Sequence, residues 1–158
     1  MRPANSGDIP SLVELRLVNA NAHLTLDPDT YRIPEPEAIA RHFAAMLADS
    51  TGQDAVFVAV TPDGRVLGMV EVLRRPDPPD HQILPPEPSA QVHTVVLSDA
   101  RGNGIGSALL KAANRWARDH GIRYISAGIH HRNAAAVHFY SRNGYTNAGL
   151  ELGRQVTD

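Results

Sequence analysis

A glycine-rich junction at residues 99–110, DARGNGIGSALL, constrains this chain more than any other feature. Gly102, Gly104 and Gly106 fall within five positions, between a run of strand-forming residues and an amphipathic helical pattern. Glycine costs roughly 0.5–1 kcal/mol relative to alanine inside a regular element, so three together indicate that the backbone must approach something closely. A strand that turns directly into a helix leaves backbone N–H groups unpaired at the positive end of the helix dipole. Such a junction favours a bound phosphate.

The spacing of this junction differs from the two familiar nucleotide-binding loops. A Walker loop needs Gly-Lys-Ser/Thr, and residues 99–110 contain no lysine. The dinucleotide fingerprint is G-x-G-x-x-G, whereas this chain has G-x-G-x-G. Arg101 adds fixed positive charge beside the glycines, and Asn103 and Ser107 add donors. A glycine turn that binds no ligand is the alternative.

Composition narrows the classes of partner. We expect a single domain over residues 1–158, long enough to bury a core. Fifteen basic and seventeen acidic residues give a formal charge of −2 without a basic stripe, so neither nucleic acid nor an anionic membrane is expected as a partner. Cysteine is absent, which removes disulfides and a cysteine nucleophile. With no signal sequence and no apolar run near the roughly 18 residues of a membrane span, we expect a cytoplasmic protein.

Apolar periodicity predicts the order α-α-β-β-β-α-β-α-β, an α/β or α+β sheet with its antiparallel part first and a strand–helix–strand crossover later. Ser6 or Asp8 is expected to cap the first helix, and the second begins near Pro36. The strands are expected at 55–60, 65–75, 90–98, 122–130 and 145–152, and the later helices at 104–120 and 133–143, the last capped by Asn133. Six prolines place residues 76–88 in an extended loop, either a tolerated insertion or an arm that contacts a partner.

Several motifs in this order resemble those of one family. Arg101-x-x-Gly104-x-Gly106 resembles the acyl-CoA pyrophosphate loop of the GNAT superfamily of N-acetyltransferases. The segments GRVLGMVEV, VHTVVLSDARGNGIGSALLKAA and NAAAVHFYSRNGY resemble that family's third strand, its central strand with loop and helix, and its later motif. The resemblance covers essentially residues 2–153. It implies a mixed, splayed central sheet flanked by helices.

The resemblance also implies a co-substrate, acetyl-CoA, and the residues that hold it. In that family the pantetheine arm lies in the gap of the sheet and bonds to backbone of the central strand, and the pyrophosphate lies on the glycine loop. Asn133 matches the position that bonds the pantetheine arm, and Tyr140 matches the general acid that protonates the CoA sulfur. The backbone N–H near Val96 is expected to polarise the thioester carbonyl. The implied cofactor contacts are Val95, Val96, Leu97, Arg101, Gly102, Asn103, Gly104, Ile105, Gly106, Ser107, Asn133 and Tyr140.

The base that takes the proton from the acceptor amine is left open between two residues. Glu71 lies in an apolar strand, where burial favours a raised pKa, and an ordinary solvent-facing position is the alternative. His93 lies on the central strand and has an intrinsic pKa suited to the task, with a structural histidine as the alternative. Without cysteine, direct attack by the amine in a ternary complex is favoured over an acyl-enzyme.

The acceptor is expected to contact the connection between the first two helices, where the family places its specificity. His23 and Tyr31 lie in this connection, and His130 lies at a strand end where ligands gather in open sheets. The connection carries both charges, so neither a cationic nor an anionic acceptor is dictated. His130 and His131 are adjacent and point to opposite faces of a strand, so no metal site is expected.

These observations predict an N-acetyltransferase acting on the primary amine of a small molecule or peptide. A non-catalytic acyl-CoA-binding sensor and an interaction protein without a ligand are the alternatives. Fourteen residues follow Gly144, where the family commonly has two strands. Either the last strand is missing or very short, or a second subunit completes the edge of the sheet. An uncovered sheet edge favours association, so a homodimer is one hypothesis.

Overall fold

The computed structural model describes residues 1–83 and 85–153 of the chain, so Leu84 of the proline-rich segment lies outside the described residues. The elements are β1 (Arg2–Pro3), η1 (Ser6–Asp8), α1 (Ile9–Leu26), α2 (Pro36–Ala48), β2 (Asp54–Val60), β3 (Val66–Arg74), β4 (Ser89–Val96), η2 (Ser98–Ala100), α3 (Ile105–Asp119), β5 (Tyr124–Ser126) and α4 (Ala134–Arg142). The strands form one sheet in the order β1-β2-β3-β4-β5. Only β4 and β5 pair in parallel. The expected mixed sheet flanked by helices is confirmed.

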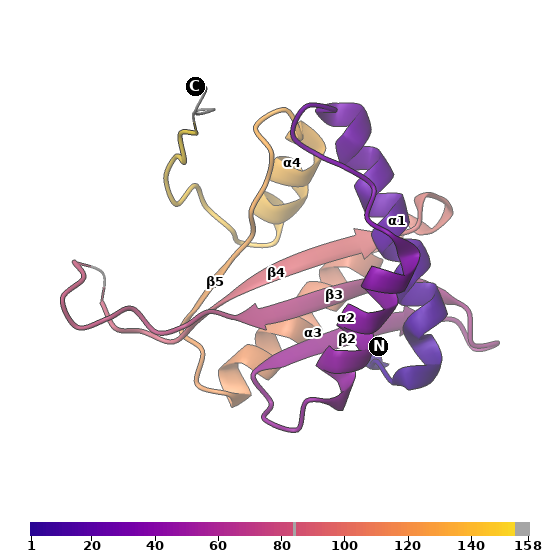
Figure 1. Cartoon of the computed structure of the whole chain (residues 1–158), viewed down its shortest axis with the longest axis horizontal. Helices are drawn as coiled ribbons and strands as arrows, with labels where there is room; N and C mark the ends of the chain where they lie inside the picture. The colour runs from indigo at the N-terminus through magenta and orange to yellow at the C-terminus, as the bar shows by residue number, and fades with distance from the viewer. Residues whose placement is uncertain (84, 154–158) are drawn as a thin grey trace.

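Helices cover both faces of this sheet, α1 and α2 on one and α3 and α4 on the other (Figure 1). Side chains alternate between the faces along each strand, so Met69 packs under α1 and α2 while Val70 packs under α3. The first face buries Leu12, Leu15, Ile39, Phe43, Val58 and Val95, and the second buries Val72, Val92, Leu109, Leu110, Ala113 and Tyr140. Two layers of core therefore hold the sheet between the helix pairs.

Strand β4 is paired along its whole length on one side and only at its beginning on the other. It pairs with β5 over Ser89–Gln91 alone, and in Figure 1 the chain that follows β5 separates from β4 toward α4. On the β3 side, Leu97 N–H donates to Leu67 O over 2.9 Å. Antiparallel pairing alternates, so the backbone groups of Val92, Thr94 and Val96 point away from β3, toward the gap.

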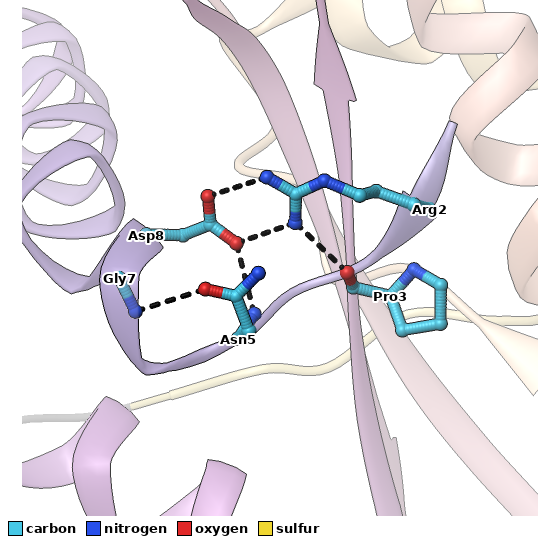
Figure 2. A network of polar contacts seen from close by, with 5 residues as sticks. All are labelled: Arg2, Pro3, Asn5, Gly7 and Asp8. Carbon is cyan, nitrogen blue, oxygen red and sulfur yellow. Dashed lines mark hydrogen bonds and ion pairs between the residues drawn. The ribbon is translucent and has the colours of Figure 1, made fainter. Parts of the chain in front are cut away.

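A polar network joins the first strand to the first helix (Figure 2). Arg2 donates from both terminal nitrogens to the Asp8 carboxylate, over 2.6 and 2.8 Å, and Asn5 N–H donates to the same carboxylate over 2.8 Å. Asn5 in turn accepts from Gly7 N–H over 2.9 Å. Of the two residues expected to cap the first helix, Asp8 stands at the N-cap position of α1, but its side chain makes no capping bond there, and Asn5 caps the preceding η1. The carboxylate of Asp8 is engaged by Arg2 and the Asn5 backbone instead.

The predicted final strand is absent from the described residues. Residues 145–153 form no strand, and Leu150 and Leu152 are exposed. The fifth strand is three residues long rather than nine, because the chain leaves β4 after Ser126. Without a neighbouring strand to bond to, apolar alternation alone does not make a strand at residues 145–152. None of the described helices is both long and apolar enough to cross a membrane.

Candidate active site

The glycine loop, residues 101–107, runs from η2 into the first turn of α3. Gly102 and Gly104 have φ of +80° and +75°, a left-handed conformation that favours glycine. The first helical bond runs from Ala108 N–H to Gly104 O, and Gly104 caps α3 without a side-chain bond. Within residues 1–83 and 85–153, the N–H groups of 102–107 find no backbone acceptor. Among the described residues, the loop is thus a row of unpaired donors at the positive end of α3.

The third glycine of the motif has a different physical reason. A Cβ added at Gly106 would lie 2.8 Å from Cε2 of Phe139, whereas one at Gly102 or Gly104 would meet nothing within 4 Å. The close approach expected at Gly106 is therefore to a side chain of the protein itself. Gly106 lets α3 pack against α4, and Gly102 and Gly104 give the loop its curvature.

The polar side chains of the glycine loop lie next to the free donors. Arg101 donates from Nε to Val96 O over 3.1 Å, so its guanidinium joins the loop to the open edge of β4. Asn103 turns its amide toward the carbonyls of Ala100 and Arg101, each at 3.4 Å. Ser107 lies in the first turn of α3, beside Ile105, which packs on the core. Arg101 therefore supplies positive charge where the loop meets β4.

The three central-strand residues expected against the pantetheine arm are not equivalent. Val96 directs its backbone groups to the gap, as Thr94 does, whereas Val95 and Leu97 direct theirs to β3. Leu97 N–H is already bonded to Leu67 O. Val96 is therefore the residue of the three that can bond an extended ligand through its backbone, as an added strand would.

Tyr140 lies on α4 with its hydroxyl toward β4. Its ring contacts those of Phe139 and Tyr145 edge-on, with centroids 5.0 and 5.1 Å away. Burial raises the pKa of Tyr140, while contacts of its hydroxyl with the side chain and backbone of Thr94 oppose that rise. Asn133 accepts from Ala136 N–H over 3.1 Å, which confirms it as the cap of the helix that carries Tyr140.

Glu71 is fully buried on β3, beneath α1 and α2. Its carboxylate bonds to Arg16 of α1, to His42 Nε2 of α2 at 3.1 Å, and lies 3.7 Å from His93 Nδ1. Burial favours the neutral acid, but the His42 hydrogen bond and the charges of Arg16 and His93 outweigh it and hold the pKa of Glu71 below its ordinary value. The raised pKa expected from the sequence is wrong. An ionised Glu71 places a negative charge beside His93, and its lowered pKa makes the carboxylate a weaker proton acceptor than a carboxylate of raised pKa would be.

His93 lies directly opposite Glu71 across the β3–β4 pair and is partly exposed. Burial lowers the pKa of His93, Glu71 opposes this, and Arg16, His23 and Arg75 lower the pKa further. The net direction is down from 6.5, so the imidazole is neutral at pH 7. A neutral imidazole fixed beside a carboxylate can accept a proton.

The three residues expected at the acceptor site come together in one cluster. His23 on α1 packs edge-on against Tyr31, with ring centroids 4.9 Å apart, and Tyr31 lies 5.7 Å from His130. His130 Nε2 bonds to Asp27 Oδ2 over 3.0 Å. The bond joins the end of α1 to the β5–α4 connection. The ring of His131 lies tilted beside that of His130, with centroids 4.4 Å apart. No group of described residues has the arrangement of a metal site.

Three residues of this site were missed in the sequence: Arg16, His42 and Thr94. Arg16 follows the buried Leu12 by four positions, so it shares the buried face of its helix, and that placement was the available signal. The other two showed no comparable pattern, because the partner of His42 lies 29 residues away and that of Thr94 lies on another element.

These features fit the polarity of a coenzyme A thioester. The free N–H groups of the glycine loop suit a diphosphate, and the open edge of β4 at Val96 suits an extended amide chain. Thr94 Oγ1 is buried with no hydrogen-bond partner in the described part of the chain, which marks a polar position that the protein leaves unfilled. The site thus offers an anion cradle, an added-strand position and two titratable groups around one gap.

Comparison with known proteins finds curated acetyltransferases that are similar to this chain. The chain is 33% identical over 96 residues to an aminoglycoside N(6')-acetyltransferase type 1 of Klebsiella aerogenes, covering 58% of this chain and 59% of that protein. It is 27% identical over 137 residues to a mycothiol acetyltransferase of Cellulomonas flavigena, covering 80% of this chain and 39% of that protein. The chain thus spans between two fifths and three fifths of the length of these two curated relatives.

A solved structure and a family model complete the comparison. A variant of protein BH1408 from Bacillus halodurans has the same fold, with a TM-score of 0.88 at 19% identity over 99% of this chain and 98% of that chain. The model of the acetyltransferase (GNAT) family matches residues 20–145. This range includes the cluster of His23, Tyr31 and His130, as well as Glu71, His93, the glycine loop and Tyr140. The chain belongs to the GNAT family of acetyltransferases.

Proposed function

We propose that this protein transfers an acetyl group from acetyl-CoA to the primary amine of a small molecule or peptide, by direct attack in a ternary complex. The observation that carries the proposal is the row of unbonded N–H groups at residues 102–107, beside an open strand edge that faces a buried tyrosine hydroxyl. Each of these features answers one need of acetyl transfer from a thioester: a grip on the diphosphate, a place for the arm and an acid for the thiolate.

Binding rests on backbone groups in this proposal. The N–H groups from Gly102 to Ser107 hold the diphosphate at the positive end of α3, with Arg101 adding charge. Arg101 must share or leave Val96 O when the arm bonds there, because its Nε occupies that carbonyl in the free protein. The Val96 N–H polarises the thioester carbonyl and stabilises the oxyanion that forms on attack.

The proton transfers fall to two side chains on opposite sides of β4. Neutral His93, held beside the ionised Glu71, takes the proton that the amine loses on attack. Tyr140 gives its phenolic proton to the sulfur as the carbon–sulfur bond breaks. An amide and a free thiol result, and His93 and Tyr140 return to their starting states by exchange with solvent.

The acceptor amine is placed by the acceptor-side cluster, His23, Tyr31 and His130. The bond between Asp27 and His130 joins the end of α1 to the β5–α4 connection. The proposed acceptor site therefore takes residues from both of these segments. The relative from Klebsiella aerogenes acts on aminoglycosides by its name. Small amine-bearing molecules are therefore the first class to test, with peptide amines as the second.

The test measures release of CoA thiol from acetyl-CoA with a panel of primary amines, including aminoglycosides, polyamines and lysine-containing peptides. The proposal predicts amine-dependent thiol release and stabilisation by acetyl-CoA, which at 100 times its Kd should add about 2.7 kcal/mol to the free energy of unfolding. Stabilisation without thiol release for any amine would favour a non-catalytic sensor. The absence of both stabilisation by acetyl-CoA and thiol release would contradict the proposal.

A further inference from the structure

The hydroxyl of Thr94 is a buried polar group without a partner: its Oγ1 forms no hydrogen bond within the described residues. A buried hydroxyl without a partner costs stability, and valine would fill nearly the same volume without that cost. The presence of threonine at such a position is therefore not explained by the packing of the core.

The surroundings of Thr94 point to Tyr140. Thr94 lies opposite Val70 in the β3–β4 register, so its side chain shares the sheet face that α3 and α4 cover. Both the side chain and the backbone of Thr94 approach the Tyr140 hydroxyl from this face. The approach falls short of a hydrogen bond of ordinary geometry, since Oγ1 counts as unpartnered. The two hydroxyls are therefore neighbours without a hydrogen bond of ordinary geometry between them.

The same residue borders the gap of the sheet. The backbone of Thr94 points away from β3 at a part of β4 that β5 does not reach. Thr94 therefore borders both the place where a thioester arm would lie and the phenol that is proposed to protonate its sulfur. A phenol that gives up its proton becomes an anion, and it needs donors at that moment rather than before.

We propose that Thr94 is a positioning residue that donates a hydrogen bond from Oγ1 to the phenol oxygen of Tyr140 while Tyr140 protonates the departing sulfur. The inference rests on the proposed function. In this step the Tyr140 O–H bond breaks and an S–H bond forms, so the negative charge passes from sulfur to the phenol oxygen. That oxygen accepts from Thr94 Oγ1–H until it regains a proton from solvent.

The kinetic test compares Thr94→Val and Thr94→Ser with the wild-type protein, using acetyl-CoA and the best amine of the panel. Thr94→Val should lower kcat about tenfold or more, leave the Kd of CoA within about twofold, and melt no lower than the wild type, because it removes an unpartnered buried hydroxyl. Thr94→Ser keeps the hydroxyl and should retain kcat within about threefold. A purely structural role would instead lower stability along with activity.

Tyr145→Phe is the matched control for the kinetic test. The Tyr145 hydroxyl is also buried without a partner in the described part of the chain, and its ring packs beside Tyr140. Its removal should leave kcat unchanged and, like Thr94→Val, should not lower the melting temperature. Wild-type kcat in Thr94→Val, or an equal loss in Thr94→Val and Thr94→Ser, would overturn the proposal.

A second readout needs no acceptor and therefore separates this inference from the proposed function. The pKa of Tyr140 is measured in the free protein by titrating ¹³C-labelled tyrosine, with the Tyr140→Phe variant identifying its signal. Loss of the Thr94 donor should raise that pKa by about one unit in Thr94→Val and leave it unchanged in Thr94→Ser. An unchanged pKa in Thr94→Val would overturn the inference, whereas an inactive wild-type protein would overturn the proposed function alone.

Discussion

The chemistry of single residues here is decided by neighbours that are distant in the sequence. Glu71 and His93 face one another on adjacent strands, but Arg16 and His42 reach the pair from two helices. Arg16 holds Glu71 ionised and, through its positive charge, helps to hold His93 neutral. The sequence predicted a raised pKa for Glu71 on β3, whereas the structure holds this carboxylate ionised. We propose that the imidazole beside it, His93, acts as the base.

Glu71→Gln tests this division of roles. In the wild type the rate should fall as the pH drops through the pKa of His93, which lies below 6.5, because the protonated imidazole accepts no proton. Glu71 is the group that raises the pKa of His93, so its neutralisation should move the acid limb of kcat/KM to still lower pH. The maximal rate should drop about tenfold or more as His93 loses its partner.

The pH profile of kcat/KM measures both effects of Glu71→Gln. Glu14→Gln, the same change at an exposed position of α1, is the control and should leave the profile in place. An acid limb that moves to higher pH in Glu71→Gln, or does not move, would argue against His93 as the base.

Tyr140→Phe tests the acid. It removes only the phenolic hydroxyl, so the ring contacts with Phe139 and Tyr145 persist. We expect kcat to fall by about 10²–10⁴, with the Kd of acetyl-CoA unchanged by calorimetry. The exposed Tyr124 gives the control Tyr124→Phe, which should behave as wild type. Equal activity in Tyr140→Phe would remove this residue from the mechanism.

At the scale of elements, two junctions set the geometry of the site. One is the glycine loop before α3, and the other is the pair of Arg2 and Asp8 before α1. At the glycine loop, the left-handed Gly102 and Gly104 turn the chain into α3, and Gly106 lets α3 approach Phe139 of α4. The contact between α3 and α4 matters for function because α4 carries Tyr140. At the other junction, Arg2 and Asp8 fix the start of α1, which carries Arg16 and His23.

Gly106→Ala should loosen the first junction. The added methyl group would lie 2.8 Å from Phe139, so either α3 or α4 must shift, and we expect a loss of about 1–3 kcal/mol in the free energy of unfolding. Chemical denaturation measures this loss. In the double variant Gly106→Ala, Phe139→Leu the smaller partner should recover part of it. A loss that is the same with and without Phe139 would show that the clash is not its cause.

Asp8→Asn should weaken the second junction in a pH-dependent way. The Arg2 hydrogen bonds hold the pKa of Asp8 below 3.8, so its contribution is present above the unfolded value and is lost as the pH falls through the lower folded value. At pH 7 the variant should lose about 1–3 kcal/mol in the free energy of unfolding, and the difference from wild type should shrink below pH 3.8. Denaturant titrations at several pH values measure it, with Asp80→Asn, at an exposed position, as the neutral control.

At the scale of the whole molecule, the sequence predicted those features of the fold that depend on residues close together in the chain. The β4–loop–α3 junction, the hairpin of β2 and β3 and the Asn133 cap depend on residues close together in the chain, and all three were expected correctly. The strand at 145–152 was wrong, because a strand needs a partner edge and its pattern does not supply one.

The candidate site was predicted in part for the same reason. His23, Tyr31 and His130 were each expected at the acceptor site, and the fold brings them together. Arg16 and His42 were missed, since their partner Glu71 is 55 and 29 residues away, and only the packing of α1 and α2 on the sheet joins them. Tertiary contacts of this kind set the pKa of Glu71, which is why its direction could not be read from the strand.

The central claim is that the free N–H groups of the glycine loop hold the diphosphate of acetyl-CoA, with the arm on the open edge of β4. Hydrogen exchange at single-residue resolution, with and without acetyl-CoA, tests it most directly. The account predicts that the amides of residues 102–107, together with that of Val96, exchange fast in the free protein and become protected on binding. Unchanged exchange at these amides in the presence of saturating acetyl-CoA would contradict it.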